Sequence, residues 1–384
     1  MSVFSLGFAL AILVVVVLMA IELMRGVRST EFLEEIPPED SPSSPFVSVV
    51  VPARNEEKNL EAALRSMLAQ TYSPFEIIVI DDRSTDQTGA ILDRLAREFP
   101  LLRVFHLQTL PNGWLGKNHA LFLGASKARG TLLLFTDADV MMEPSTLSRS
   151  IRYLMTERLD HLAVSPRLAM DGLVLNIFAI GFNFFFSLYA RPWKARDRRS
   201  PAHIGIGAFN LMRREVYESI GTHQQIAMRP DDDMKLGKLV KKMGFSQGFL
   251  MGNRLISVEW YSSVKNLIQG MMKNSFAGVN YRVSLVIAAT LGQLVIFVWP
   301  FIAVLLARGP SRWVYLAIIL LLLSLAGGGA YLCRNVVGLS VGLPLASVVL
   351  LYIMWNSMIQ IYWHQGIFWR DTHYPLHLLK ANKI

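Results

Sequence analysis

The chain has 384 residues, of which 52% are hydrophobic and only 17% are charged, so it is too apolar for an ordinary soluble protein. Its single cysteine excludes a fold that depends on disulfides. The net charge of +9 comes without a regular basic face interleaved with aromatic residues. We therefore expect no nucleic-acid partner and attribute the charge to a surface that faces anionic lipid.

The first predicted element is a transmembrane anchor in residues 1–28. Its apolar core, LGFALAILVVVVLMAI, is long enough to cross about 30 Å of hydrocarbon as a helix. A cleaved signal peptide is the alternative, but the apolar stretch is long and no charged segment precedes it. Arg25 and Arg28 follow, which by the positive-inside rule places the next segment in the cytoplasm. Residues 29–45, which contain EEIPPEDSPSSP, are predicted to be a linker.

Short apolar runs then alternate with helical patterns. Strands are predicted at 46–53, 76–82 and 102–107, and in the TLLLF that precedes Asp137. A helix is predicted from Asn55, and a second helix is predicted in STDQTGAILDRLAREF, where Ser84 and Gln87 have the spacing of a capping box at its start. Continuously apolar strands that alternate with helices indicate a parallel sheet covered on both faces. The predicted fold class is therefore α/β, with a Rossmann-like first half.

Charged side chains stand where the predicted strands end. They are Arg54, Asp81, Asp82, Asp137 and Asp139. Ligands of open α/β sheets bind outside the carboxyl ends of the strands, so these groups are expected to converge on one crevice. Carboxylates that lie together repel one another, which predicts a cation between them. Oxygen ligands suit Mg²⁺ or Mn²⁺ bridging to a diphosphate. Alternatively, the Asp-Ala-Asp sequence only caps a turn after a strand.

Four segments, in order along the chain, resemble family 2 glycosyltransferases of the GT-A fold. They are VVVPARNEEKNL, IVIDDRSTDQT, GKNHAL and FTDAD. The resemblance implies a GT-A catalytic domain over residues 46–283, with a donor half at 46–142 and an acceptor half at 143–283. It also implies a nucleotide-sugar donor, and the family favours a UDP-sugar.

The same resemblance assigns roles to individual residues. Asp82 would hydrogen-bond the base or ribose of the nucleotide sugar, Asp139 would bind the metal directly, and Asp137 would contact ribose or metal. The base pocket would be lined by Pro52, Arg54 and Glu56. Lys117 would lie near the diphosphate, unless it is only a surface lysine at the start of a helix.

A later segment, RPDDDMKLGKLVKKMGF, resembles the acidic-pair motif of the family, which is usually Glu-Asp before a helix. Alignment on Leu236 makes Asp232 and Asp233 the pair. Transfer to a hydroxyl requires a base, and neighbouring carboxylates raise one another's pKa values, which suits a base. Asp233 is therefore predicted to be the catalytic base, with Asp232 as the second candidate. The alternative is a helix N-terminus that carries acids because of the helix dipole.

The last predicted region, residues 284–384, is a C-terminal membrane domain and tail. It contains three apolar runs near spanning length, at about 284–306, 313–333 and 340–363. An earlier apolar segment, 173–190, is followed by the basic sequence RPWKARDRR. This segment is predicted to be an interfacial helix with a polybasic edge, and a buried core helix or a further span are the alternatives.

The acceptor is predicted to be a membrane lipid. Processive synthases of the family carry a Gln-x-x-Arg-Trp motif that this chain lacks, which favours transfer of a single sugar. The layout resembles bacterial membrane glycosyltransferases associated with hopanoid and carotenoid lipids, although WRDTHYPL departs from their last motif. The resemblance implies inverting transfer by a multi-pass protein of the bacterial cytoplasmic membrane, with its catalytic domain facing the cytoplasm. A silent scaffold or transport component, a processive polysaccharide synthase and a nucleotidyltransferase are the alternatives.

Overall fold

The computed structural model describes residues 2–39, 44–370 and 372–384, and these residues form two compact units. The first, called here the sheet unit, contains the described residues of 30–169, 192–259 and 377–384. The second, called here the apolar unit, contains the described residues of 1–29, 170–191 and 260–376. Each unit is therefore assembled from three separate stretches of sequence.

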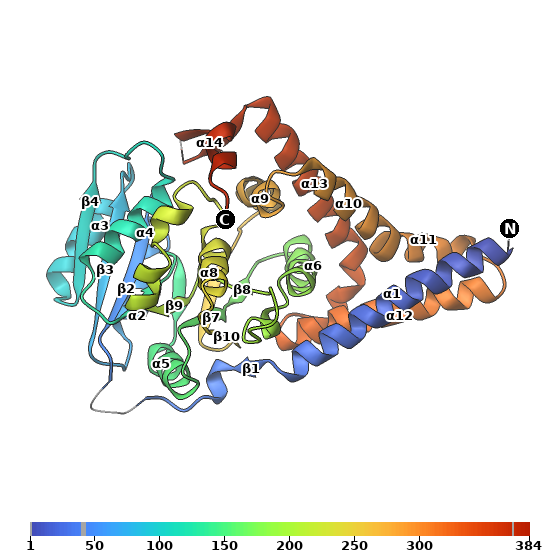
Figure 1. Cartoon of the computed structure of the whole chain (residues 1–384), viewed down its shortest axis with the longest axis horizontal. Coiled ribbons are helices and arrows are strands. Elements are labelled where there is room, and N and C mark those ends of the chain that lie inside the picture. Colours follow the sequence, from blue (N-terminus) through green and yellow to red (C-terminus); the bar gives the residue numbers. More distant parts are fainter. Residues whose placement is uncertain (1, 40–43, 371) are drawn as a thin grey trace. The chain divides into compact units, whose positions relative to one another are not determined.

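The sheet unit is built on a mostly parallel sheet, whose described strands have the order β1-β10-β7-β9-β5-β2-β3-β4 (Figure 1). Strand β9 is antiparallel to both of its neighbours, β5 and β7. The strands are β1 (Glu31–Phe32), β2 (Val47–Ala53), β3 (Phe75–Asp82), β4 (Leu102–Leu107), β5 (Leu132–Phe135), β7 (His161–Ser165), β9 (Asn210–Arg213) and β10 (Gln247–Met251). The predicted α/β class is confirmed, and β2, β3 and β4 match their predicted ranges to within one residue.

Helices cover both faces of this sheet because successive residues of a strand point in opposite directions. Val49 and Val51 of β2 belong to a core cluster with α2 (Leu60–Leu68), α3 (Thr88–Glu98) and α5 (Thr146–Thr156). Val50 belongs to a separate cluster with α4 (Gly116–Lys127), α7 (Arg214–Ser219) and α8 (Asp232–Lys242). Burial on both faces explains why the strand is continuously apolar here. A smaller sheet contains β6 (Val140–Met142), β11 (Ile256–Glu259) and β8 (Arg167–Ala169).

Two predicted helix starts are wrong, and the reason is the same for both. Helix α2 begins at Leu60, because Asn55 has a left-handed backbone with φ of 54°. Helix α3 begins at Thr88, and the side chain of Gln87 makes no capping hydrogen bond. Instead, the backbone N–H of Asn55 donates to Ser84 Oγ at 3.0 Å. These polar residues connect the loops that follow two neighbouring strands, which the local capping pattern does not reveal.

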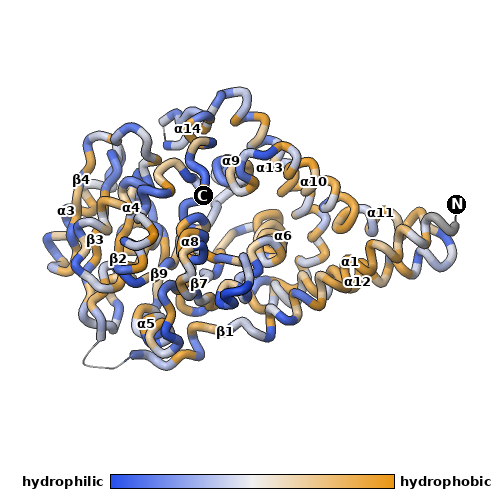
Figure 2. The backbone as a smooth tube through the Cα atoms, in the orientation of Figure 1, coloured by the Kyte–Doolittle hydropathy of each residue, from blue (hydrophilic) through white to orange (hydrophobic). Residues whose placement is uncertain are grey.

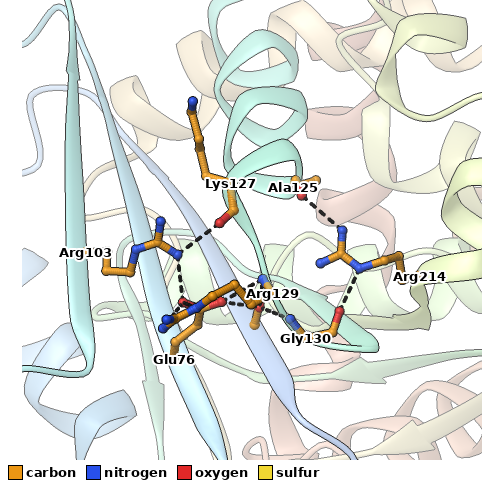
Figure 3. Close-up of polar contacts among 8 residues, drawn as sticks. Glu76, Arg103, Ala125, Lys127, Arg129, Gly130 and Arg214 are labelled. Carbon is orange, nitrogen blue, oxygen red and sulfur yellow. Dashed lines mark hydrogen bonds and ion pairs between the residues drawn. The ribbon is translucent and has the colours of Figure 1, made fainter.

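A buried ion cluster lies at the opposite end of β2 and β3 (Figure 3). The Glu76 carboxylate, which is 1% exposed, accepts hydrogen bonds from Arg103 Nη1 at 2.8 Å, Arg129 Nε at 2.9 Å and Ser48 Oγ at 2.7 Å. Burial alone raises the pKa of Glu76, but the bonds from Arg103, Arg129 and Ser48 outweigh it and lower the pKa to about 2. The cluster joins β3 to β4 and to the end of α4.

Glu76→Gln is expected to lower the free energy of unfolding by about 2 kcal/mol, because it weakens charge-assisted hydrogen bonds to a buried carboxylate. The donors Arg103 and Arg129 are themselves 32% and 65% exposed, which limits the loss. Thermal unfolding in detergent measures this loss. The native pKa of Glu76 lies below its ordinary value of 4.5, so the stabilisation is present above pH 4.5 and is lost as the pH falls towards 2. The matched control is Glu98→Gln, which removes an exposed pair with Arg65 and should cost much less. Equal losses for both variants would contradict the prediction.

The apolar unit consists mainly of long helices with few charges (Figure 2). Its elements are α1 (Ser2–Arg28), α6 (Leu173–Ala190), α9 (Val264–Gly278), α10 (Val283–Gln293), a π-helical turn (Leu294–Val298), α11 (Trp299–Leu306), α12 (Pro310–Leu332), α13 (Leu343–Trp363), β12 (Gly366–Trp369), β13 (Thr372–Pro375) and the start of α14 (Leu376–Ala381). Among the described residues, five helical segments are long and apolar enough to cross a membrane: Ser5–Arg28, Leu173–Lys194, Val283–Leu306, Pro310–Leu332 and Val337–Trp363. Four of these correspond to the predicted N-terminal and C-terminal spans.

Within the apolar unit, the largest helix contacts form two groups, which are joined by smaller contacts of α6 with α12 and of α13 with α10. Helix α1 runs beside α12, which also contacts α11 (Figure 1). Helix α13 packs against α6 and α9. The contact between α13 and α6 is close, since a Cβ atom added at Gly181 would lie 2.3 Å from the Cβ of Ala346. Small residues at a helix interface allow such close approach, as is typical of helices in membranes.

Candidate active site

The carboxyl ends of β2 and β3 bring together several of the predicted nucleotide-binding residues. Asp82, which is 3% exposed, lies 3.7 Å from Arg54 and accepts a hydrogen bond from Arg83 Nε at 2.7 Å. Pro52 is near the end of β2, one residue before its last. The first residue of α4, Gly116, must be glycine here, because a Cβ atom at this position would lie 2.1 Å from Asp82 Oδ2. The start of α4 therefore closes against the end of β3.

Asp81 does not join this group in the way that the sequence suggests. Its Oδ2 atom lies 2.7 Å from His106 Nδ1, and its Oδ1 accepts the backbone N–H of Ser84 at 3.2 Å. The hydrogen bond with Asp81 raises the pKa of His106 above its ordinary value. Asp81 therefore holds the end of β3 to β4, and the expectation that all five strand-end charges converge on one crevice is wrong for this residue.

A second group of charges surrounds Lys117, in the first turn of α4. Lys117 Nζ lies 2.7 Å from Asp137 Oδ1 and 3.6 Å from Asp232 Oδ2. Burial disfavours the ammonium, but the carboxylates of Asp137, Asp232 and Asp233 outweigh it and raise the pKa of Lys117. The alternative interpretation of Lys117 as a surface lysine is wrong, because its side chain is 21% exposed and is paired on two sides.

These side chains line a cavity in the sheet unit whose empty space of about 250 Å³ includes space open to solvent. Its walls are formed by Lys117, Leu121, Phe135, Thr136, Asp137, Gly207, Asn210, His223, Asp232, Asp233 and Leu236. Several of the polar groups lie at strand ends or on the first turns of α4 and α8, whereas His223 lies on a short 3₁₀ turn.

The three consecutive aspartates of α8 and its N-cap have different environments. Asp231 accepts two hydrogen bonds from Arg229, both at 2.8 Å, and lies 3.3 Å from Lys235 Nζ. Asp233 instead accepts the backbone N–H of Gly207 at 2.9 Å and faces the cavity. Burial, and then the carboxylate of Asp232, raise the pKa of Asp233 to about 7. Of the three, Asp231 is fully paired, whereas Asp232 and Asp233 remain at the cavity.

Asp139 lies in the turn between β5 and β6. Burial, and then the carboxylates of Asp137 and Glu56, raise the pKa of Asp139 to about 7. Glu56 is thereby placed near Asp139, and its backbone N–H donates to Thr88 Oγ1 at 2.8 Å. A cation bound beside Asp139 would relieve this repulsion, so the donor set fits a divalent metal. Among the described residues, however, no group of three or more His, Cys, Asp and Glu side chains is gathered to hold one. Protein carboxylates would therefore supply only part of a coordination shell.

Seven residues that line the cavity were not predicted to belong to the site: the apolar Leu121, Phe135 and Leu236, together with Thr136, Gly207, Asn210 and His223. Gly207 could have been recognised from the sequence, because HIGIGAF contains two glycines that are separated by one residue and precede a strand. A Cβ atom at Gly207 would lie 2.9 Å from Asp137 Oδ2 and 3.6 Å from Asp233 Oδ2. Thr136, Asn210 and His223 are common polar types without a distinctive spacing, and only the fold brings them to the site.

Gly207→Ala is expected to lower kcat/KM for the transfer reaction predicted from the sequence by about tenfold, because the new methyl group displaces the Asp137 carboxylate from Lys117. Steady-state kinetics with a labelled donor measure the change. Gly278→Ala is the matched control, since a Cβ atom at Gly278 meets nothing within 4 Å. Unchanged kinetics in Gly207→Ala would show that the space beside Asp137 is not needed.

A mostly parallel α/β sheet whose strand ends gather carboxylates around a small cavity agrees with the GT-A fold expected from the sequence. Residues 48–221 match the profile of glycosyl transferase family 2. Over this domain the chain resembles the family 2 glycosyltransferases.

Its curated relatives include two staphylococcal enzymes. The chain is 28% identical over 246 residues to the 4,4'-diaponeurosporenoate glycosyltransferase of Staphylococcus haemolyticus, covering 61% of this chain and 62% of that one. It is 25% identical over 242 residues to the Staphylococcus aureus enzyme of the same name, covering 60% and 61%. The chain therefore spans less than two thirds of the length of these relatives. It resembles carotenoid-associated glycosyltransferases.

One solved structure has the same overall fold. It is the mannosyltransferase PcManGT from Pyrobaculum calidifontis in complex with GDP-Man and Mn²⁺. The two folds superpose with a TM-score of 0.55 at 16% identity, over 91% of this chain and 99% of that chain. At this identity the likeness establishes the fold alone.

Proposed function

We propose that this protein transfers a single sugar from a nucleotide-sugar donor to a lipid acceptor in a membrane, with a divalent cation and with inversion at the anomeric carbon. The observation that carries the proposal is the cavity where Lys117, Asp137, Asp232 and Asp233 meet. In this cavity, the ammonium of Lys117 can bind a diphosphate and the carboxylate of Asp137 can bind a metal. Asp233 adds a carboxylate whose pKa is raised, and such a transfer requires groups of these three kinds.

In the proposed complex, Arg54 and Asp82 bind the nucleoside, and Pro52 and Glu56 complete its pocket. Lys117 contacts the diphosphate. Asp139 and Asp137 hold Mn²⁺ or Mg²⁺, which when bound stabilises the negative charge of the departing nucleoside diphosphate. Asp233 accepts the proton of the acceptor hydroxyl, and Asp232 keeps the pKa of Asp233 high. Attack by that oxygen from the face opposite the leaving group gives inversion.

The donor and acceptor are proposed by class. A UDP-sugar is the first choice, and GDP-sugars are tested beside it because PcManGT binds GDP-Man. The staphylococcal relatives are named for a carotenoid carboxylate, which supports an apolar acceptor with one polar end. Arg25 and Arg28 at the end of α1 support a catalytic domain on the cytoplasmic side of a bacterial cytoplasmic membrane.

The proposal is tested by incubating the purified protein in lipid extract with radiolabelled UDP-sugars and GDP-sugars, in Mn²⁺, Mg²⁺ or EDTA. The expected result is metal-dependent label in one organic-soluble product, which names the acceptor. Asp93→Asn, on the exposed side of α3, serves as the control for variants at the cavity. Label in a long polymer would support a processive synthase. Absence of donor binding and turnover would support a catalytically silent scaffold or transport component.

A further inference from the structure

Helix α6 leaves the sheet unit and returns to it. The strand before the helix, β7, and the strand after it, β9, are paired antiparallel, with His161 opposite Met212 and Leu162 opposite Leu211. Paired strands belong to one folded body, so both ends of α6 lie on the same side of any membrane. A helix that crosses a membrane once has its ends on opposite sides. Although α6 is long and apolar enough to span, it therefore does not cross once.

The same reasoning applies to the C-terminal helices. The strand that precedes them, β11, pairs with β6 and β8 of the sheet unit. The tail that follows them also belongs to that unit. Asn382 Oδ1 accepts the backbone N–H of Met228 at 3.0 Å, and Asn382 Nδ2 donates to Gln225 O at 2.8 Å. The number of crossings between Glu259 and His377 must therefore be even, whereas this stretch contains three apolar segments of spanning length.

Packing within the apolar unit identifies the segment that does not cross. Helix α12 runs beside α1, the predicted anchor, and also contacts α11. Helix α13 packs mainly on α6 and α9, and it makes smaller contacts with α10 and the π-helical turn. Its first turns are close to α6, since a Cβ atom at Gly342 would lie 2.6 Å from Ile177 Cγ2. Its last turns are bound to α9, where Ser357 Oγ accepts the backbone N–H of Phe276 at 3.3 Å. Helix α9 is not among the five candidate spans.

We infer that α10, α11 and α12 make two crossings, while α6 and α13 form an apolar platform that inserts into one leaflet on the side of the sheet unit. The partner of this platform is the lipid of that leaflet. Helices of this kind lie along the membrane interface and bury one apolar face among the lipid chains. The inference concerns membrane topology and is independent of the proposed function.

The uncovered faces of the platform fit this partner. Both helices expose large apolar side chains, among them Leu173 at 63%, Val348 at 48% and Ile359 at 51%. Aromatic residues stand exposed at their C-terminal ends, Tyr189 on α6 and Trp363 on α13. Aromatic side chains at such positions are typical of a membrane interface. The exposed arginines that follow α6 are Arg191, Arg196, Arg198 and Arg199, which suit anionic headgroups at the same interface.

The test is cysteine labelling of the full-length protein in membrane vesicles of both orientations, with a maleimide that does not cross membranes. The native Cys333 is first replaced by serine. Single cysteines are then introduced at exposed positions: Lys58→Cys as the sheet-unit reference, Asp171→Cys and Arg198→Cys around α6, Arg308→Cys between α11 and α12, Val336→Cys between α12 and α13, and Lys383→Cys in the tail. Labelling after detergent solubilisation shows that each cysteine can react.

The expected result is that Asp171→Cys, Arg198→Cys, Val336→Cys and Lys383→Cys react in the same vesicle orientation as Lys58→Cys. Arg308→Cys alone among these variants should react in the opposite orientation. Reaction of Asp171→Cys and Arg198→Cys from opposite sides would overturn the inference for α6. If Lys383→Cys is labelled in the same vesicle orientation as Arg308→Cys, there are three C-terminal crossings, and the inference for α13 is overturned. The assignment of the crossing pair would be overturned if Val336→Cys were labelled in the same orientation as Arg308→Cys. It would also be overturned if Arg308→Cys were labelled in the same orientation as Lys58→Cys.

Discussion

Asp233→Asn is expected to slow transfer to a hydroxyl acceptor by about 10²–10⁴-fold in kcat, which is the usual contribution of a general base. The side chain keeps its shape and can still accept the N–H of Gly207, so the fold and the donor KM should change little. Because the pKa of Asp233 is raised to about 7, its basic form is lost as the pH falls below 7. At saturating metal, the wild-type rate should therefore decrease about tenfold per pH unit below 7, and the variant should lack this dependence.

The informative comparison for Asp233→Asn is Asp231→Asn, two residues away. Asp231 is paired with Arg229 and Lys235, so its loss should lower the melting temperature and leave the pH profile unchanged. A carboxylate acceptor carries no proton at neutral pH, so Asp233→Asn should slow transfer to it less than transfer to a hydroxyl. If Asp233→Asn retains the wild-type pH profile and rate, the base is another group, and Asp232→Asn is the next variant to measure.

Asp139→Asn is expected to reduce metal-dependent transfer by about 10²–10³-fold, in the range found when one group that stabilises developing charge is removed. The carboxylate is disfavoured in the free protein, because burial, Asp137 and Glu56 raise its pKa. Bound cations compete with protons for such a carboxylate, so metal affinity should weaken as the pH falls below about 7. Titration of Mn²⁺ by calorimetry, without donor, measures this affinity apart from turnover.

Asp93→Asn is the control for Asp139→Asn, since it removes an exposed carboxylate whose side chain is 59% exposed. It should leave Mn²⁺ affinity and transfer unchanged. If Asp139→Asn transfers sugar at the wild-type rate, or if the rate is equal with Mn²⁺ and with EDTA, the proposed metal is not needed. Lys117 would then be the cation that faces the diphosphate.

The fold was predictable because it depends on strong and local patterns. Apolar runs at β2 and β3 report burial on both sheet faces, and these two strands and the edge strand β4 were each located to within one residue. The start of α2 was not predictable in the same way. Asn55, Glu56 and Glu57 look like a first helical turn, but their backbone and side chains instead bind the loop after β3. That contact joins residues about thirty positions apart, so it cannot be predicted from the pattern of neighbouring residues.

The site was predictable where a residue type stood at a strand end, as with Asp82 and Asp137. Sequence could not separate the three aspartates at 231–233, because the distinction depends on Arg229 and Lys235 folding back on Asp231. Nor could it detect His223, which reaches the cavity from a short 3₁₀ turn and hydrogen-bonds with Tyr217 at 2.8 Å. Such residues become part of a site only through tertiary packing.

The discontinuous sequence of the sheet unit affects how the protein is made. Met228 and its hydrogen-bond partner Asn382 are separated by 154 residues, and the apolar helices lie between them. At about 5–20 residues per second, a ribosome needs roughly 8–30 s to synthesise that interval. During this time the loop at Gln225–Met228 lacks its last contacts, while hydrophobic helices emerge that need a lipid environment. Completion of the sheet unit during biosynthesis therefore follows membrane insertion, and a chain that fails to insert leaves that unit unfinished.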